Sequence, residues 1–166
     1  MICFDADQTL IDLAPAMREA LRLALSRIQT LLPGSDALTV ETLIAERNAV
    51  AAELGTRASM EAIRQEAFKR SLTPLGAADE IVRMVTAEYL ADRFRLARLY
   101  PDVIPTLNRL RGRYALGLAT NGNSYPERAG LAAYFSFVVY ANKCGFRKPD
   151  LGFFEAVRQA AQHAHA

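Results

Sequence analysis

The pattern of apolar and polar positions changes twice along the chain. A short apolar run, Ile2-Cys3-Phe4, predicts a buried strand at the start. From residue 13 to residue 99, apolar residues return every three or four positions, and this spacing predicts helices. Breaks at Pro33-Gly34, Gly55 and Pro74-Leu75-Gly76 divide this segment into four helices with short connections. We expect this segment to form a small helical bundle.

After residue 100, apolar runs alternate with helical patterns. Residues 114–119 and 137–140 are predicted strands, and the predicted helices are residues 102–111, 125–131 and 150–162. In the first of these helices, Ile104, Leu107 and Leu110 are expected to face inward. Strands that alternate with helices are typical of a parallel α/β sheet. The fold prediction is therefore an α/β, Rossmann-like core of residues 1–12 and 100–166, interrupted by a helical insertion of residues 13–99.

Composition and charge exclude several kinds of partner. The 166 residues are 51% hydrophobic and carry 20 basic against 18 acidic side chains, a net charge of +2. Such a chain can bury a core, and no basic stripe indicates nucleic-acid binding. No apolar run approaches the roughly 20 residues of a membrane span, and no leader pattern opens the chain, so we expect a cytoplasmic protein. The arginines of the insertion are expected mainly on solvated helix faces, although one could reach an anionic substrate: Arg47, Arg57, Arg64 and Arg70.

The scarce residue types restrict the chemistry. The two histidines, His163 and His165, lie in the last four residues, which disfavours a histidine-dependent catalytic triad. The two cysteines, Cys3 and Cys144, are too few for a cysteine-rich zinc site, and Cys3 is expected to be buried in its strand. Catalysis would have to use carboxylates, hydroxyls, amides, lysine or arginine.

Three polar segments follow predicted strands, where open α/β sheets bind their ligands. They are Asp5-Ala6-Asp7, Thr120-Asn121-Gly122-Asn123 and Lys148-Pro149-Asp150. Each alone could be an ordinary turn or helix start. Together they bring a carboxylate pair, a hydroxyl with backbone amides, and a lysine to one edge. One carboxylate could attack while the other moves a proton, the amides and lysine could bind phosphate, and the carboxylates could bind Mg²⁺.

These segments resemble the motifs of the haloacid dehalogenase-like superfamily. Phe4-Asp5-Ala6-Asp7-Gln8-Thr9-Leu10 is similar to its first motif, Leu118-Ala119-Thr120-Asn121-Gly122 to its second, and Gly145-Phe146-Arg147-Lys148-Pro149-Asp150 to its third. Tyr100-Pro101-Asp102-Val103 resembles the return from a helical cap, which is the role implied for the insertion.

The resemblance also implies a role for each motif residue. Asp5 would be the nucleophile that forms an aspartyl-phosphate, and Asp7 the general acid and base. Both would bind Mg²⁺. The phosphoryl group would be held by Thr120, Asn121 and Gly122 and neutralised by Lys148. Near these motifs, Asn123 and Tyr125 are the best further candidates for the site.

Two residues of the first motif refine this interpretation. Asp7 could protonate a departing alkoxide, whereas a halide needs no acid. We therefore prefer a phosphatase acting on a small phosphorylated metabolite to a 2-haloacid dehalogenase. Gln8 stands where the family usually has glycine, which reduces backbone freedom there, and its side chain could narrow the pocket or touch substrate.

The sequence ends in the last predicted helix, before the family's fourth, acidic motif. The core would then lack its C-terminal strands, and the first strand would be an exposed edge. Three explanations stay open: a fragment of a longer protein, a sheet completed by a homodimer that covers this edge, or a natural truncation without catalysis. The alternative function is accordingly a non-catalytic binding or interaction module of the same fold.

Overall fold

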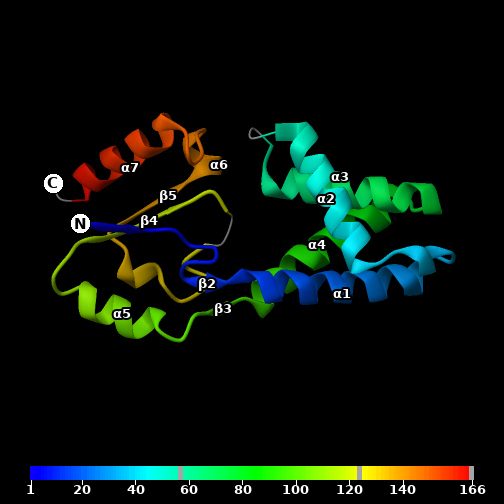
Figure 1. The fold of residues 1–166 in the computed structure, drawn as a ribbon, viewed down its shortest axis with the longest axis horizontal. Coiled ribbons are helices and arrows are strands. Elements are labelled where there is room, and N and C mark those ends of the chain that lie inside the picture. The colour runs from blue at the N-terminus through cyan, green and yellow to red at the C-terminus, as the bar shows by residue number, and fades with distance from the viewer. Residues whose placement is uncertain (56–57, 123–124, 165–166) are drawn as a thin grey trace. The chain divides into compact units, whose positions relative to one another are not determined.

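The computed structural model describes residues 1–55, 58–122 and 125–164. The chain forms two compact units, whose elements are labelled in Figure 1. The core unit comprises Met1–Leu13 and Ala97–Ala166, and the helical unit comprises Ala14–Leu96.

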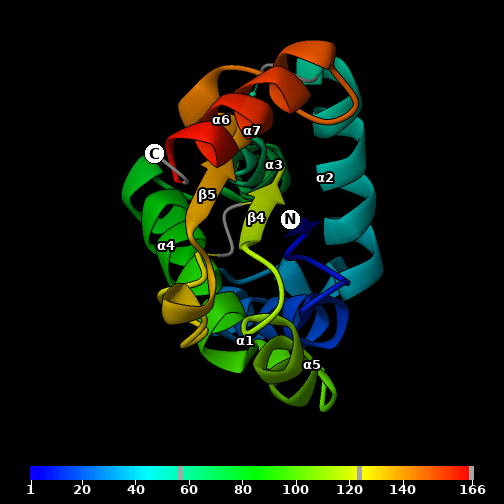
Figure 2. The ribbon, with the colours of Figure 1, turned by 90° about the vertical axis from the view of Figure 1, so that its left-hand side faces the viewer.

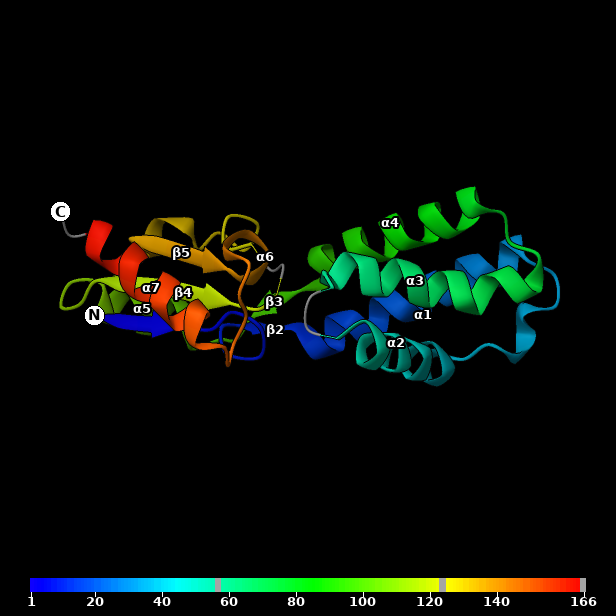
Figure 3. The same cartoon turned by 90° about the horizontal axis from the view of Figure 1, so that it is seen from above.

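The core unit contains a parallel sheet of three strands, β1 (Ile2–Phe4), β4 (Leu116–Thr120) and β5 (Phe137–Tyr140), in the order β1-β4-β5 (Figure 3). Ile2 lies opposite Leu116, and Gly117 opposite Phe137. Every residue of β4 is buried, as expected for a central strand that is covered on both faces. The predicted α/β fold with a parallel sheet is confirmed.

Two helices cover opposite faces of this sheet (Figure 2): α5 (Val103–Leu110) and α7 (Leu151–His163). Successive side chains of a strand point to opposite faces, so β4 contributes to two separate apolar clusters. Leu116 and Leu118 pack with residues of α5, whereas Ala119 packs with residues of β5 and α7. Because β1 and β4 are parallel, their carboxyl ends lie at the same edge of the sheet.

The predicted facing of α5 is partly wrong. Leu107 is fully buried and Leu110 packs against the core, but Ile104 is 36% exposed, and Val103 is buried in its place. The expectation for Cys3 is also wrong, because Cys3 is exposed on β1. Among the described residues, β1 is an edge strand of the sheet. Its expected pairing with a second copy of the chain stays a prediction.

Several short elements differ from the sequence prediction. β2 (Ile11–Asp12) and β3 (Arg98–Leu99) form an antiparallel ladder where the chain leaves and re-enters the core unit. Neither this ladder nor α6 (Ala141–Cys144) was expected, because such short segments show no periodicity. The helix expected over 125–131 does not form. The segment makes hydrogen-bonded turns around Gly130, whose φ of +71° ends any helical path, before a 3₁₀ turn at Ala132–Tyr134.

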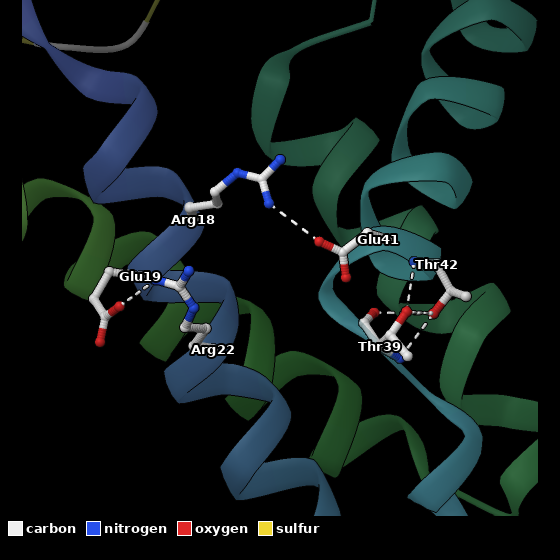
Figure 4. Close-up of polar contacts among 6 residues, drawn as sticks. All are labelled: Arg18, Glu19, Arg22, Thr39, Glu41 and Thr42. Carbon is white, nitrogen blue, oxygen red and sulfur yellow. Dashed lines mark hydrogen bonds and ion pairs between the residues drawn. The ribbon is translucent and has the colours of Figure 1, made fainter.

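The helical unit contains the four predicted helices: α1 (Leu13–Leu31), α2 (Val40–Leu54), α3 (Met60–Leu72) and α4 (Asp79–Leu96). Their apolar faces form one core cluster, in which Ile28, Leu72, Val85 and Tyr89 are fully buried. Side-chain caps begin two of these helices. The side chains of Thr39 and Thr42 each accept the other residue's backbone N–H at the start of α2 (Figure 4), and the hydroxyl of Ser59 accepts the Ala62 N–H.

Most charged side chains of the helical unit lie at its surface, as expected. Figure 4 shows two exposed pairs, Arg18 with Glu41 at 3.1 Å and Arg22 with Glu19 at 2.8 Å. Exposed pairs of this kind contribute little to stability. Arg64 contradicts the expectation of a solvated helix face, since it is only 3% exposed. Arg57 lies outside the described residues.

A search of the described helices for one long and apolar enough to cross a membrane finds none.

The close contact between β4 and β5 gives a stability prediction. A side-chain carbon at Gly117 would collide with the ring of Phe137, which is 9% exposed and has little room to move. We expect Gly117→Ala to lower the free energy of unfolding by about 1–3 kcal/mol. Gly112→Ala is the matched control, because a carbon there meets nothing within 4 Å. Urea unfolding followed by circular dichroism compares the two, and equal stability of the two variants would contradict the packing described.

Candidate active site

The three polar segments predicted to share one edge of the sheet do come together. Asp5 directly follows β1, Thr120 ends β4, and Lys148 lies between α6 and α7. The Lys148 Nζ lies 2.8 Å from Asp5 Oδ1 and donates a hydrogen bond of 2.9 Å to the Ala119 carbonyl. The two side chains of the ion pair are 26% and 41% exposed, so both can be reached from solvent. Residues far apart in the chain thus form an accessible carboxylate–ammonium pair.

The Asp5 carboxylate is held from two directions. Besides the Lys148 ammonium, its Oδ1 accepts the backbone N–H of Ala6 at 2.8 Å. Two donors on one oxygen orient the carboxylate. This arrangement suits a carboxylate that must present an oxygen to a ligand.

Asp7 lies beside the segment that follows β4. A side-chain carbon at Gly122 would collide with the Asp7 carboxylate, so the close approach depends on glycine at 122. The Asp7 Oδ1 is buried and has no hydrogen-bond partner among the described residues. A buried acceptor without a donor is unfavourable, and a proton, a water molecule or a cation would relieve it.

The segment after β4 is organised by its own hydrogen bonds. The Thr120 hydroxyl accepts the Gly122 N–H at 3.0 Å, and a hydroxyl that accepts one hydrogen bond can still donate its own hydrogen. Thr120 is completely buried, so its proposed contact with a phosphoryl group stays a prediction.

The Asn121 side chain has a role that the sequence did not reveal. Its Oδ1 accepts the Lys148 N–H at 2.7 Å, and its Nδ2 donates to the Lys148 carbonyl at 2.9 Å. These two bonds hold the backbone of Lys148 in place beneath its ammonium group. The sequence indicated only that both residues belong to motifs, because a contact across so many residues leaves no local pattern.

Gln8 adopts a left-handed conformation, with a φ of +59°. Its N–H donates to the Ile11 carbonyl at 2.8 Å, which closes the loop around Asp7. Its side-chain Oε1 accepts the Leu13 N–H at 3.3 Å and the Tyr100 hydroxyl at 3.0 Å. Glycine would adopt this left-handed conformation without strain, so the reduced backbone freedom expected at Gln8 has a cost here. The Gln8 side chain links the loop to the start of α1.

Two tyrosines near the site have raised pKa values. Partial burial and the Asp12 carboxylate raise the pKa of Tyr100, whose hydroxyl lies 3.4 Å from Asp12 Oδ1. Burial and the Glu127 carboxylate raise the pKa of Tyr140, whose hydroxyl donates to Glu127 at 3.3 Å.

Of the further candidates, Tyr125 packs against Tyr140 with ring centroids 5.1 Å apart. Asn123 and His165 lie outside the described residues, so nothing is added to the predictions for them.

The oxygen ligands at this edge fit a magnesium ion. Mg²⁺ is commonly bound by one or two carboxylates, with water and substrate phosphate completing the shell. Asp5 supplies a carboxylate oxygen and Asp7 a backbone carbonyl oxygen, and the buried, unpartnered Oδ1 of Asp7 is left to hold a proton or a water molecule. In the part of the chain that the structure describes, no three histidine, cysteine, aspartate or glutamate side chains are placed to hold a metal ion together.

Comparison with known proteins gives consistent matches in sequence. The model of a family described as haloacid dehalogenase-like hydrolase matches residues 1–165. The glyceraldehyde 3-phosphate phosphatase of Methanopyrus kandleri is 30% identical over 95% of this chain and 69% of its own length. The 5-amino-6-(5-phospho-D-ribitylamino)uracil phosphatase of Escherichia coli is 32% identical over 93% of this chain and 68% of its own length.

A solved structure gives a match in fold. The 2-haloacid dehalogenase of Pseudomonas syringae pv. Tomato superposes with a TM-score of 0.74 at 33% identity, over 96% of this chain and 72% of its own.

The left-handed backbone at Gln8 gives a second stability prediction. Gln8→Ala loses both side-chain hydrogen bonds and keeps the strained φ, whereas Gln8→Gly loses the same bonds and removes the strain. We expect the glycine variant to be more stable than the alanine variant by about 1 kcal/mol. Thermal unfolding of the pair measures the difference. A more stable alanine variant would show that the backbone at this position is not left-handed.

Proposed function

The chain belongs to the haloacid dehalogenase-like hydrolases, and on that premise we propose that it hydrolyses the phosphate monoester of a small metabolite. The observation that carries the proposal is the Asp5–Lys148 pair. Its two charged groups are 2.8 Å apart and accessible, and Asp7 lies on the same loop as Asp5. A carboxylate beside a fixed ammonium can attack a phosphoryl group whose negative charge the ammonium offsets.

In the first proposed step, an Asp5 oxygen attacks the phosphorus atom. A bond forms between this oxygen and phosphorus while the bond to the ester oxygen breaks, and the Asp7 carboxyl group gives its proton to the departing alkoxide. In the second step, Asp7 removes a proton from a water molecule whose oxygen attacks phosphorus. The bond between phosphorus and the Asp5 oxygen breaks, and inorganic phosphate is released. Asp5 is regenerated, and Asp7 again holds a proton.

The neighbouring residues would bind and orient the phosphoryl group. We assign the Thr120 hydroxyl and the Asn121 N–H to its oxygens, and Lys148 to its negative charge. The two bonds from the Asn121 side chain to the Lys148 backbone support this assignment, because they keep the ammonium group in position. Gly122 leaves room for the Asp7 carboxylate.

Asp5 would hold Mg²⁺ through its carboxylate and Asp7 through its backbone carbonyl, so that the Asp7 carboxyl group can carry the proton. When bound, the ion would neutralise charge on the phosphoryl oxygens.

The relatives support a small phosphorylated metabolite as the class of substrate, but they differ in the substrate that each is named for. Two curated relatives are named as phosphatases of a triose phosphate and of a phosphoribitylamino compound, and these activities are theirs. For this chain we propose a small phosphorylated metabolite.

Dehalogenation is a second candidate because the Pseudomonas syringae structure, at 33% identity, is that of a 2-haloacid dehalogenase. Such a reaction displaces halide from carbon, and the halide leaves without a proton. An acid at position 7 would have no part in that step. Asp7, placed beside Gly122 at the site, therefore favours phosphate ester hydrolysis.

Replacement of the proposed nucleophile is the first test. We expect Asp5→Asn to reduce Mg²⁺-dependent hydrolysis of p-nitrophenyl phosphate by about 10³-fold or more, because the amide cannot form the covalent intermediate. Asp102→Asn, an exposed aspartate of the same unit, should retain full activity. Equal turnover by the wild type and Asp5→Asn, or a folded wild type without turnover, would overturn the proposal. The second result would favour the non-catalytic binding module.

The leaving group tests the role of Asp7. We expect Asp7→Asn to lose about 10²–10⁴-fold on an alkyl phosphate, whose alkoxide needs a proton, and much less on p-nitrophenyl phosphate. Phosphate release from both esters measures this difference. Chloride release from 2-chloropropionate, assayed in parallel, tests the second candidate. Chloride release that is unaffected by Asp7→Asn, without phosphate release, would establish dehalogenation instead.

A further inference from the structure

The helical unit contains a buried arginine whose described contacts are weak. Arg64, on α3, is 3% exposed. Its guanidinium lies over the ring of Tyr89, 5.3 Å from the centroid, and its Nη2 donates to the sulfur of Met17 at 3.0 Å. A thioether is a weak acceptor and an aromatic face carries no net charge, so neither contact neutralises the guanidinium.

Three polar atoms around this guanidinium are buried and have no hydrogen-bond partner within the described ranges. They are Arg64 Nε on α3, Arg47 Nε on α2 and the Tyr89 hydroxyl oxygen on α4. All three groups can donate a hydrogen bond, and buried donors in folded proteins are nearly always paired. Three neighbouring helices therefore present donors for which the described residues supply no acceptor.

The surrounding charges are unmatched as well. The only side-chain bond described for Arg47 is to the neutral Asn48 at 2.9 Å, and no described ion pair includes Arg47 or Arg64. Another arginine of the unit is closely paired. Arg70, also on α3, lies 2.7 Å from Glu53 and 2.9 Å from Glu66. The absence of an acid beside Arg64 is thus a local feature of the described part of this unit.

Arg64 nevertheless keeps its charge at neutral pH. Burial, and to a smaller extent the charges of Arg47 and Arg93, lower the pKa of Arg64 to about 10, while Tyr89 acts in the opposite direction. Two guanidinium groups close enough to repel each other are stabilised by an anion between them, and the planar arginine fork matches both carboxylate and phosphate oxygens.

We propose that Arg64, Arg47 and Tyr89 form a binding site for a small oxyanion, a carboxylate or a phosphate-type group, within the helical unit. The donors come from α2, α3 and α4 alone, and none belongs to the Asp5–Lys148 site. The site does not depend on the proposed phosphatase activity.

Thermal unfolding of the full chain in rising phosphate or acetate, with chloride at the same ionic strength as reference, tests the site. The Lys148→Ala background removes the ammonium that would bind phosphate in the core unit. We expect the melting temperature to rise with the logarithm of the anion concentration above the Kd, since an anion at 100 times its Kd shifts the folding equilibrium roughly a hundredfold. A rise in melting temperature with only one of the two anions would identify the preferred oxyanion.

Adding Arg64→Met should abolish the rise, whereas Arg70→Met, which removes a paired arginine from the same helix, should retain it. An equal rise with Arg64→Met, or no logarithmic rise above the chloride reference with either anion, would overturn the proposal.

Nuclear magnetic resonance gives a second measurement that needs no folded Arg64→Met variant. The Nε–Hε signal of Arg64, assigned with Arg64→Lys, should shift on titration with the active anion. An Arg64 signal that does not move while the melting temperature rises would place the anion elsewhere and overturn the site.

Discussion

The register of the parallel sheet determines where the polar groups of the candidate active site lie. Ile2 opposite Leu116 and Gly117 opposite Phe137 bring the strand ends to one edge. Only in that register can Lys148, which follows the last of these strands, bond the Ala119 carbonyl and the Asp5 carboxylate at once. The register itself depends on apolar packing, because a shift by one residue would turn Leu116 and Leu118 away from α5.

Strand ends and helix caps could be predicted because their causes are local. Asp5 and Lys148 follow apolar runs, and Thr39 and Ser59 precede helical patterns, so composition within a few residues was sufficient. The Asn121 bonds to Lys148 and the burial of Arg64 depend on packing between distant segments, which leaves no periodic signal. The ladder between β2 and β3 was missed for a related reason, since two-residue strands are stabilised by their pairing and too short to show alternation.

The loop of the first motif combines two requirements that oppose each other. Its left-handed turn favours glycine, yet Gln8 occupies it and uses its side chain to accept from Leu13 and Tyr100. The strain of the turn is offset by bonds that link the Asp7 loop to both chain segments joining the two units, at Leu13 and at Tyr100. A glycine would relieve the backbone strain but would lose these hydrogen bonds. Gln8 therefore keeps a strained backbone in a loop that its side chain holds in place.

The positive charges of Lys148 and Arg64 lie in opposite environments. In the core unit, Lys148 is paired with a carboxylate and open to solvent, so an incoming phosphoryl group can exchange contacts with Asp5 at little desolvation cost. In the helical unit, Arg64 is already desolvated and lacks a described counter-charge, so an anion would gain a strong interaction without displacing an acidic side chain. The first arrangement suits a group that is bound, transformed and released. The second suits a group that is recognised and held.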